Sequence, residues 1–173
     1  MKKIGILALQ GSFSEHAKML ASLKQKFVFV RSKQDLENIT HLIIPGGEST
    51  TLEKLLKDFN IWKLLENKKI NIFGTCAGAI LCQKLGMDIE IERNAYGGQQ
   101  SSFIADLDSE LFTELEGVFI RAPKLKVENK KIKILAQFQS QPVLLQQDHF
   151  LVASFHPELS GDARVHKYFL GLE

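Results

Sequence analysis

The sequence contains only two cysteines among its 173 residues, Cys76 and Cys82. Six residues along one helix separate two Cα atoms by about 9 Å, which is farther than a disulfide bridges. Neither cysteine has the histidine or cysteine spacing of a zinc site, so the sequence predicts no disulfide framework and no metal site. Cys82 has no glycine or turn beside it and is interpreted as a core residue. Any cysteine chemistry is therefore expected at Cys76.

The sequence also lacks a long hydrophobic run. No stretch approaches the roughly 18 apolar residues that a membrane-spanning helix needs. The first apolar run ends at Gln10-Gly11 without a small-residue cleavage pattern, and it suits a first strand better than a secretion signal. We therefore expect a cytoplasmic protein with reduced thiols and no membrane contact.

The net charge of +2 is too small to indicate a nucleic-acid-binding protein. The densest basic segment, at 124–133, is interpreted as a solvated hairpin rather than a binding surface. A hydrophobic fraction of 45% with 24% charged residues is typical of a globular protein, and the length predicts one domain over 1–173. No strand-to-helix loop has a G-x-G-x-x-G or Walker pattern, so no cofactor is predicted.

Short apolar runs alternate with amphipathic stretches in the first half of the chain. Strands are predicted at 2–9, 26–30, 41–44 and 70–73. Helices are predicted between and after them, at 12–23, 52–59, 61–67 and following 74–78, the first opened by a capping box from Ser12 to Glu15. Buried strands joined by helices indicate a three-layer α/β fold with a mostly parallel central sheet, of the flavodoxin-like kind.

The second half of the chain is richer in strands than in helices. The strand-like segments lie at 89–92, 102–105, 117–121, 133–139, 143–147 and 150–155. They are predicted to add to the edge of the sheet in antiparallel orientation. A last helix is predicted to begin near Asp162.

The segment from Gly74 to Gly78 places Cys76 between two glycines directly after an apolar strand. The pattern G-x-C-x-G is the cysteine form of the nucleophile elbow, a sharp turn whose flanking positions must be small. The turn leaves the sulfur at a helix N-terminus, where the positive end of the helix dipole favours the thiolate, which is the reactive form. Cys76 is therefore the predicted nucleophile.

A nucleophilic cysteine needs a proton carrier and a group that orients it. Of the five histidines, only His156 follows directly on a strongly apolar strand, whose end is expected at the functional edge of the sheet. Glu158, two residues on, can return to the imidazole and fix its tautomer. The N–H of Ala77 and that of Gly47, in the Pro45-Gly46-Gly47 turn, are predicted to stabilise a developing oxyanion.

The segments PGGEST, GTCAG and FHPEL, in this order, resemble the class I, triad-type glutamine amidotransferases. A narrower resemblance, to the glutaminase subunits of pyridoxal 5′-phosphate synthase, rests on five segments: LALQG at 7–11, PGGESTT at 45–51, ERNAYG at 92–97, VFIRAP at 118–123 and SFHPEL at 154–159. This resemblance covers essentially the whole chain. It implies hydrolysis of L-glutamine through a thioester on Cys76, with His156 and Glu158 completing the triad, and delivery of the ammonia to a synthase subunit.

The resemblance also implies which residues hold the substrate. They are Gly47, Glu48, Ser49, Arg93, Ile120 and Arg121. Arg93 and Arg121 are expected to be a buried pair that binds the α-carboxylate of glutamine. The loop of Gln10 is expected near the interface with the synthase, which activates the glutaminase.

The chain departs from the family pattern at Gly98, where the family usually has Arg, and in the segment 84–88, which is shorter than usual. Two alternatives stay open beside the vitamin B6 glutaminase. One is a glutaminase serving another biosynthetic synthase, and the other is a non-catalytic scaffold or binding subunit with the same fold.

Overall fold

The computed structural model describes residues 2–93, 95 and 102–172. Its centre is a seven-stranded sheet in which five neighbouring strands run parallel and two further strands extend one edge in antiparallel orientation. In spatial order the strands are β2 (Phe27–Val30), β1 (Ile4–Leu7), β3 (His41–Ile44), β4 (Asn71–Thr75), β11 (Phe150–Ala153), β10 (Gln141–Gln147) and β9 (Lys133–Phe138).

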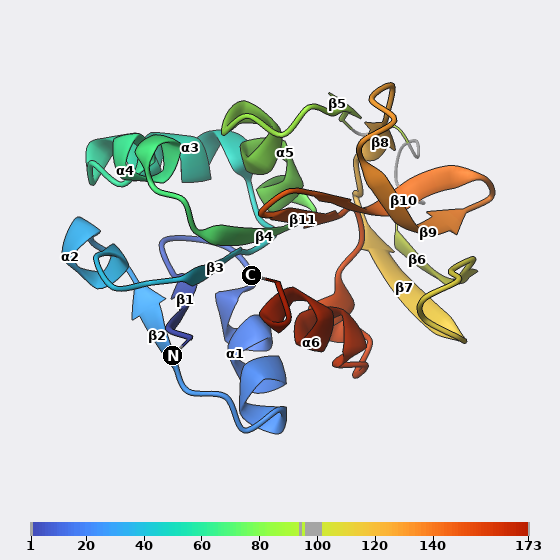
Figure 1. The fold of residues 1–173 in the computed structure, drawn as a ribbon, viewed down its shortest axis with the longest axis horizontal. Helices are drawn as coiled ribbons and strands as arrows, with labels where there is room; N and C mark the ends of the chain where they lie inside the picture. Colours follow the sequence, from blue (N-terminus) through green and yellow to red (C-terminus); the bar gives the residue numbers. More distant parts are fainter. Residues whose placement is uncertain (1, 94, 96–101, 173) are drawn as a thin grey trace.

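Helices cover both faces of this sheet, which gives the three predicted layers (Figure 1). One face carries α3 (Ser49–Asp58), α4 (Trp62–Asn67) and α5 (Ala77–Lys84), and the other carries α1 (Phe13–Ser22) and α6 (Arg164–Leu170). Strand β3 shows why the sheet is apolar on both sides. Leu42 and Ile44 belong to one hydrophobic cluster, while Ile43, between them, belongs to the other. A four-residue helix that the sequence did not predict, α2 (Lys33–Leu36), precedes β3.

The antiparallel edge predicted for the second half of the chain is correct for β9 and β10 and wrong for the other strands. Strand β11 lies between β4 and β10 and runs parallel to β4. All four of its residues are buried, as suits a central strand. The remaining strands form two small antiparallel sheets, one of β5 (Glu90–Glu92) with β8 (Lys124–Lys126) and one of β6 (Ser102–Leu107) with β7 (Leu115–Ile120).

The basic segment at 124–133 is not the hairpin that its charge pattern predicted. Strand β8 pairs instead with β5, and Lys126 forms an ion pair with Glu92. The reason is Leu125, which is fully buried in the core between the two lysines and opposite Ile91. The apolar residue therefore decides the pairing of this strand.

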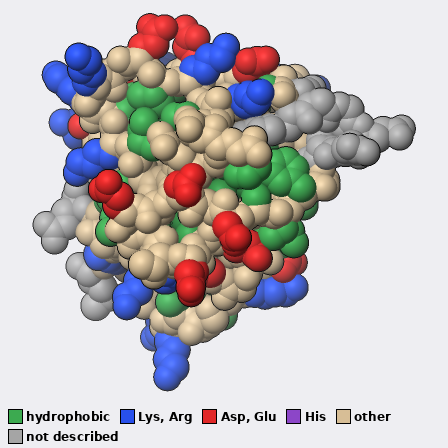
Figure 2. All heavy atoms as spheres, turned by 90° about the vertical axis from the view of Figure 1, so that its right-hand side faces the viewer, with side chains coloured by type: hydrophobic (Ala, Val, Ile, Leu, Met, Phe, Trp, Pro, Cys, Tyr) green, Lys and Arg blue, Asp and Glu red, His purple; other side chains and the backbone are tan. Residues whose placement is uncertain are grey.

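The side of the molecule formed by β6, β7, β9 and β10 exposes apolar residues. Figure 2 views this side and shows hydrophobic side chains among acidic ones. Ile104 of β6, Leu111 and Ile134 of β9 are among the strongly exposed apolar residues of the chain.

Within the described residues, no helix is both long enough and apolar enough to span a membrane.

Candidate active site

Cys76 lies in the strained turn that the glycine pattern predicted. It is the N-cap of α5 directly after β4, and its backbone has φ 50° and ψ −108°. Positive φ is uncommon for a residue other than glycine and marks a constrained position. The helix and the neighbouring strand close on the turn, because a Cβ added to Gly78 would lie 2.1 Å from the carbonyl oxygen of Ile44. The small residue at this position is a packing requirement.

The parallel neighbour of β4 brings His156 to the same edge of the sheet. Ala153 of β11 lies opposite Thr75, and the N–H of Cys76 donates to the carbonyl oxygen of Ala153 at 2.8 Å. The Cys76 and His156 side chains meet beside Gly46, where an added Cβ would lie 2.6 Å from His156 Cε1 and 3.2 Å from Cys76 Cβ. The two side chains therefore share one site, as the sequence required.

His156 and Glu158 form a buried, hydrogen-bonded pair. His156 Nδ1 lies 2.7 Å from Glu158 Oε1, and the Glu158 side chain is fully buried. Burial opposes charge on His156, but its hydrogen bonds with Cys76 and Glu158 raise the pKa of the imidazole to about 10. Burial likewise opposes charge on Glu158, but the neighbouring His16 and the hydrogen bond with His156 lower the pKa of the carboxyl to about 2. At neutral pH the pair is therefore an imidazolium and a carboxylate.

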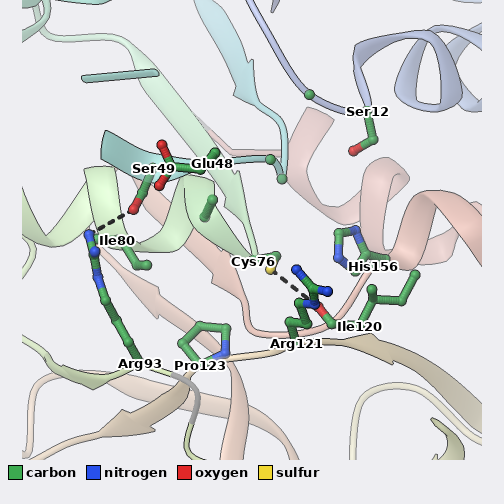
Figure 3. A pocket seen from close by; sticks show the side chains of 14 residues that line it. Ser12, Glu48, Ser49, Cys76, Ile80, Arg93, Ile120, Arg121, Pro123 and His156 are labelled. Carbon is green, nitrogen blue, oxygen red and sulfur yellow. Dashed lines mark hydrogen bonds between the residues drawn. The ribbon is translucent and has the colours of Figure 1, made fainter. Parts of the chain in front are cut away.

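Cys76 opens into a cavity of about 420 Å³, which is within the size range of small-molecule sites. Its sulfur also lies 3.7 Å from the carbonyl oxygen of Ile120 (Figure 3). Nearly all the residues expected at the site line this cavity: Gly47, Glu48, Ser49, Cys76, Ala77, Arg93, Ile120, Arg121 and His156.

The arginines are not the buried pair that was expected. Arg93 and Arg121 are both exposed, because each lies in a short segment that leaves a small two-stranded sheet at the cavity wall. Arg93 Nη2 donates to Ser49 Oγ at 2.7 Å, which ties it to the start of α3 (Figure 3). Both guanidinium groups thus belong to the solvent-exposed part of the cavity wall.

Gln10 and Glu48 hold the glycine turn in place. Glu48 N–H donates to Gln10 Oε1 at 3.0 Å, and the Glu48 carboxylate caps α3 by accepting from the N–H groups of Thr50 and Thr51. The Glu48 side chain is therefore engaged by its own helix, although the residue lines the cavity.

The predicted capping box at the start of α1 is wrong. Ser12 is the N-cap residue, but its side chain makes no cap hydrogen bond. Its hydroxyl instead donates to Glu158 Oε1 at 2.9 Å. The capping pattern in the sequence could not reveal this, because the acceptor is 146 residues away along the chain.

Two buried histidines behind the site were also missed. His16 of α1 and His166 of α6 are fully buried, and their Nδ1 and Nε2 atoms lie 2.9 Å apart. His16 Nε2 is 3.1 Å from Thr75 Oγ1 and 3.6 Å from Glu158 Oε2. The available signal was helical spacing, because His16 shares the buried face of α1 with Leu20, one turn later.

Of the two departures from the family pattern, Gly98 lies outside the described residues. The short segment 84–88 forms the turn that ends α5. Gly86 has φ 111° there, and Met87 is buried in the core. Among the described residues, no group of three or more His, Cys, Asp or Glu side chains is arranged to hold a metal ion.

The sequence matches the model of the SNO glutamine amidotransferase family over residues 6–172. The chain belongs to this family. A curated relative from Francisella tularensis subsp. holarctica, "Pyridoxal 5′-phosphate synthase subunit PdxT", is 45% identical, and the match covers 99% of each chain. The protein of the same name from Desulforamulus reducens is 47% identical, over 96% of this chain and 97% of the relative.

A solved structure described as a glutamine amidotransferase has the same fold. It superposes with a TM-score of 0.90 at 43% sequence identity and covers 96% of both chains. The family's α/β architecture with its mostly parallel sheet therefore extends over nearly the whole chain.

Proposed function

We propose that this chain is the glutaminase subunit of a pyridoxal 5′-phosphate synthase. It hydrolyses L-glutamine to L-glutamate and ammonia, and the ammonia passes to a partner synthase subunit that makes pyridoxal 5′-phosphate. Membership of the glutamine amidotransferase family and the whole-chain likeness to PdxT support this function. The observation that carries it is the strained Cys76 turn beside the hydrogen-bonded His156–Glu158 pair. The proposed location of this reaction is the cytoplasm, as expected from the sequence.

Catalysis proceeds in two steps. The Cys76 thiolate, having given its proton to His156, attacks the side-chain amide carbon of glutamine. The His156 imidazolium then protonates the leaving nitrogen, which departs as ammonia and leaves a glutamyl thioester on Cys76. In the second step His156, now neutral, takes a proton from water as the water attacks the thioester. Glutamate leaves, the sulfur is released, and Glu158 holds the imidazole in one orientation throughout.

Each tetrahedral intermediate places a negative charge on the former carbonyl oxygen. The N–H groups of Ala77 and Gly47 are the proposed donors to this oxygen, because Ala77 follows the nucleophile and Gly47 lines the cavity from the neighbouring strand end. One donor of this kind typically contributes about 10²–10³ in rate.

We infer the orientation of the substrate from the residues that line the cavity. The amide end lies at Cys76, and the charged α-carbon end lies at the part of the cavity wall formed by the exposed Arg93 and Arg121 with Ile120 and Ser49. Guanidinium groups pair well with carboxylates. Glu48 is proposed to contribute to glutamine binding as part of the cavity wall. Gln10, whose Oε1 accepts from the Glu48 N–H, is the proposed contact between the site and the synthase.

The test is release of glutamate from glutamine by the purified chain mixed with a pyridoxal 5′-phosphate synthase subunit. We expect activity in the wild type and none in Cys76→Ala. Cys82→Ala is the matched control, because Cys82 is buried in the core and does not line the cavity, and it keeps its activity. An electrophilic glutamine analogue should add to Cys76 alone.

Substantial activity in Cys76→Ala contradicts the assigned nucleophile. Absence of both glutamate release and labelling in the wild type with its partner favours the non-catalytic scaffold. Activity that requires a different synthase favours the other glutaminase.

A further inference from the structure

Behind Glu158, and outside the cavity wall, lies a chain of buried polar groups that the proposed reaction does not use. His166 Nε2 is 2.9 Å from His16 Nδ1, and His16 Nε2 is 3.1 Å from Thr75 Oγ1. Both imidazole rings have no exposed surface. The chain joins α6, α1 and the end of β4, which are distant in the sequence and adjacent at the site.

Both rings are neutral at neutral pH. Burial lowers the pKa of His16, and burial together with the nearby His16 lowers the pKa of His166 to about 3. A neutral imidazole has one nitrogen that donates a hydrogen bond and one that accepts. The hydrogen bond between the two rings therefore has only two possible directions, and the direction determines what His16 presents to Glu158.

The charge on Glu158 selects between the two directions. His16 Nε2 is 3.6 Å from Glu158 Oε2, which is too long for a good hydrogen bond but close enough for a strong electrostatic effect in a buried site. If His16 donated to His166, its Nε2 lone pair would face the carboxylate. If His166 donates to His16, the Nε2–H of His16 faces the carboxylate instead. The second direction is attractive and the first repulsive.

The unpaired atoms agree with this choice. Among the described residues, His166 Nδ1 has no hydrogen-bond partner. When His166 donates through Nε2, its Nδ1 is a bare acceptor. In the opposite direction Nδ1 would be a buried N–H without a partner, and orphaned buried N–H groups are rarer than under-satisfied acceptors.

We propose that His16 and His166 are positioning residues for Glu158, with His166 Nε2–H donating to His16 Nδ1 and His16 Nε2–H facing Thr75 Oγ1 and Glu158 Oε2. This inference rests on the proposed glutaminase function. The facing N–H attracts Oε2 toward α1 and leaves Oε1 for His156 Nδ1, at 2.7 Å. Glu158 is thereby kept charged and in one rotational position while His156 gains and loses its proton.

The same chain reaches the glycine turn on the other side of the site. Thr75 Oγ1 accepts a hydrogen bond from Gly46 N–H at 3.1 Å as well as facing His16. His16 is thus connected both to the carboxylate and to the turn that carries Gly47. The titratable groups that act on Glu158 and on this chain are His16 and Glu15 of α1, His156 before the short 3₁₀ helix η1 (Pro157–Leu159), and His166 of α6. Cys76 acts on His156.

The test uses four variants of the full chain. His16→Leu removes the N–H that faces Glu158, His166→Leu removes the donor to His16, and His166→Gln restores a donor at that position. His41→Leu is the matched control, because His41 is equally a buried histidine but lies at the start of β3, the opposite end of the sheet from Cys76. Two quantities are measured: kcat and KM for glutamine with the synthase present, and the His156 pKa by NMR titration of the resting chain.

We expect His16→Leu to lower kcat roughly tenfold, a part of the 10²–10⁴ that a positioned general base contributes, with KM nearly unchanged. The His156 pKa should fall from about 10 in this variant, because a misplaced carboxylate no longer supports the imidazolium. His166→Leu should show the same changes to a smaller extent, and His166→Gln should return both values toward wild type. His41→Leu should leave both unchanged, even where it lowers the melting temperature.

The proposal is overturned if His16→Leu and His166→Leu change kcat and the His156 pKa no more than His41→Leu does. If His16→Leu does not fold, the comparison of His166→Leu with His166→Gln decides in the same way. The titration separates this proposal from the glutaminase itself, because it needs no turnover. A wild type without glutaminase activity contradicts the proposed function and leaves the titration result to decide the role of the two histidines.

Discussion

Ser12 and Glu158, 146 residues apart in the chain, are joined by a hydrogen bond of 2.9 Å from the serine hydroxyl to Oε1 of the carboxylate. The same oxygen lies 2.7 Å from His156 Nδ1. Ser12, the N-cap residue of α1, therefore contacts Glu158, which orients the proposed general base His156. Charge-assisted hydrogen bonds of this kind are stronger than neutral ones.

Replacing Ser12 by Ala should lower the stability of the protein and its activity without abolishing the activity. Loss of a hydrogen bond to a charged group typically costs about 1.5–3 kcal/mol, and we expect a reduction of this size in the free energy of unfolding, with a several-fold fall in kcat. Ser14→Ala, on the exposed side of the same helix, is the control and should change neither. Denaturant unfolding and steady-state kinetics measure the two effects. Equal behaviour of the two variants would contradict the role given to Ser12.

Thr75→Val should be damaging although the two side chains have nearly the same shape. The hydroxyl accepts from Gly46 N–H and contacts His16, and both partners would lose their hydrogen bond in a buried place. An unpaired buried polar group costs about 1–3 kcal/mol. We expect lower stability and a lower kcat in Thr75→Val, and near wild-type values in Thr75→Ser, which keeps the hydroxyl. A Thr75→Val enzyme as stable and active as wild type would show that these contacts have little energetic weight.

The charge state of His156 should depend on Cys76. Its pKa of about 10 includes a contribution from the hydrogen bond with Cys76. In Cys76→Ala that contribution is lost, while burial still opposes the charge, so the pKa should fall. NMR titration of the imidazole between pH 6 and 11 measures the change, and Cys82→Ala provides the reference. An unchanged His156 pKa in Cys76→Ala would place the sulfur out of reach of the imidazole.

His166 should make the protein sensitive to acid. Its pKa is about 3 in the folded chain, where burial keeps the ring neutral, and near the ordinary 6.5 when unfolded. The unfolded chain therefore binds more protons between these values, so stability is present above pH 6.5 and is lost as the pH falls toward 3. One such group contributes a slope of at most about 1.4 kcal/mol per pH unit. Melting temperatures measured from pH 7 to 4.5 should fall less steeply in His166→Leu than in wild type; parallel curves would contradict this.

The sequence predicted the elbow, the His156–Glu158 contact and the parallel half of the fold because each depends on local patterns. Cys76 and Gly78 need only a strand, a turn and a helix in succession, and the strand-helix alternation of residues 2–84 follows from hydrophobic periodicity. The catalytic roles assigned to these residues stay predictions until the variants are measured. The single domain over 1–173 likewise stays a prediction.

Several of the errors involve partners that the local pattern does not contain. Ser12 has the sequence of a helix cap, but its hydroxyl meets Glu158. Leu125 is surrounded by lysines, but its burial pairs β8 with β5. His16 and His166 are connected only through the packing of α1 against α6 and the sheet. Strand pairing and polar contacts across the core depend on the assembled fold, and spacing along one segment cannot specify them.

The position of β11 has a consequence for how the protein matures during translation. This strand, at Phe150–Ala153, fills the place beside β4, and its end carries His156. A nascent polypeptide that has left the ribosome only as far as β10 has an unpaired edge at β4 and no imidazole beside the sulfur. Cys76 therefore meets His156, the proposed proton carrier, only when β11 completes the sheet. We expect such incomplete chains to lack the proposed activity and to aggregate more readily through the open edge.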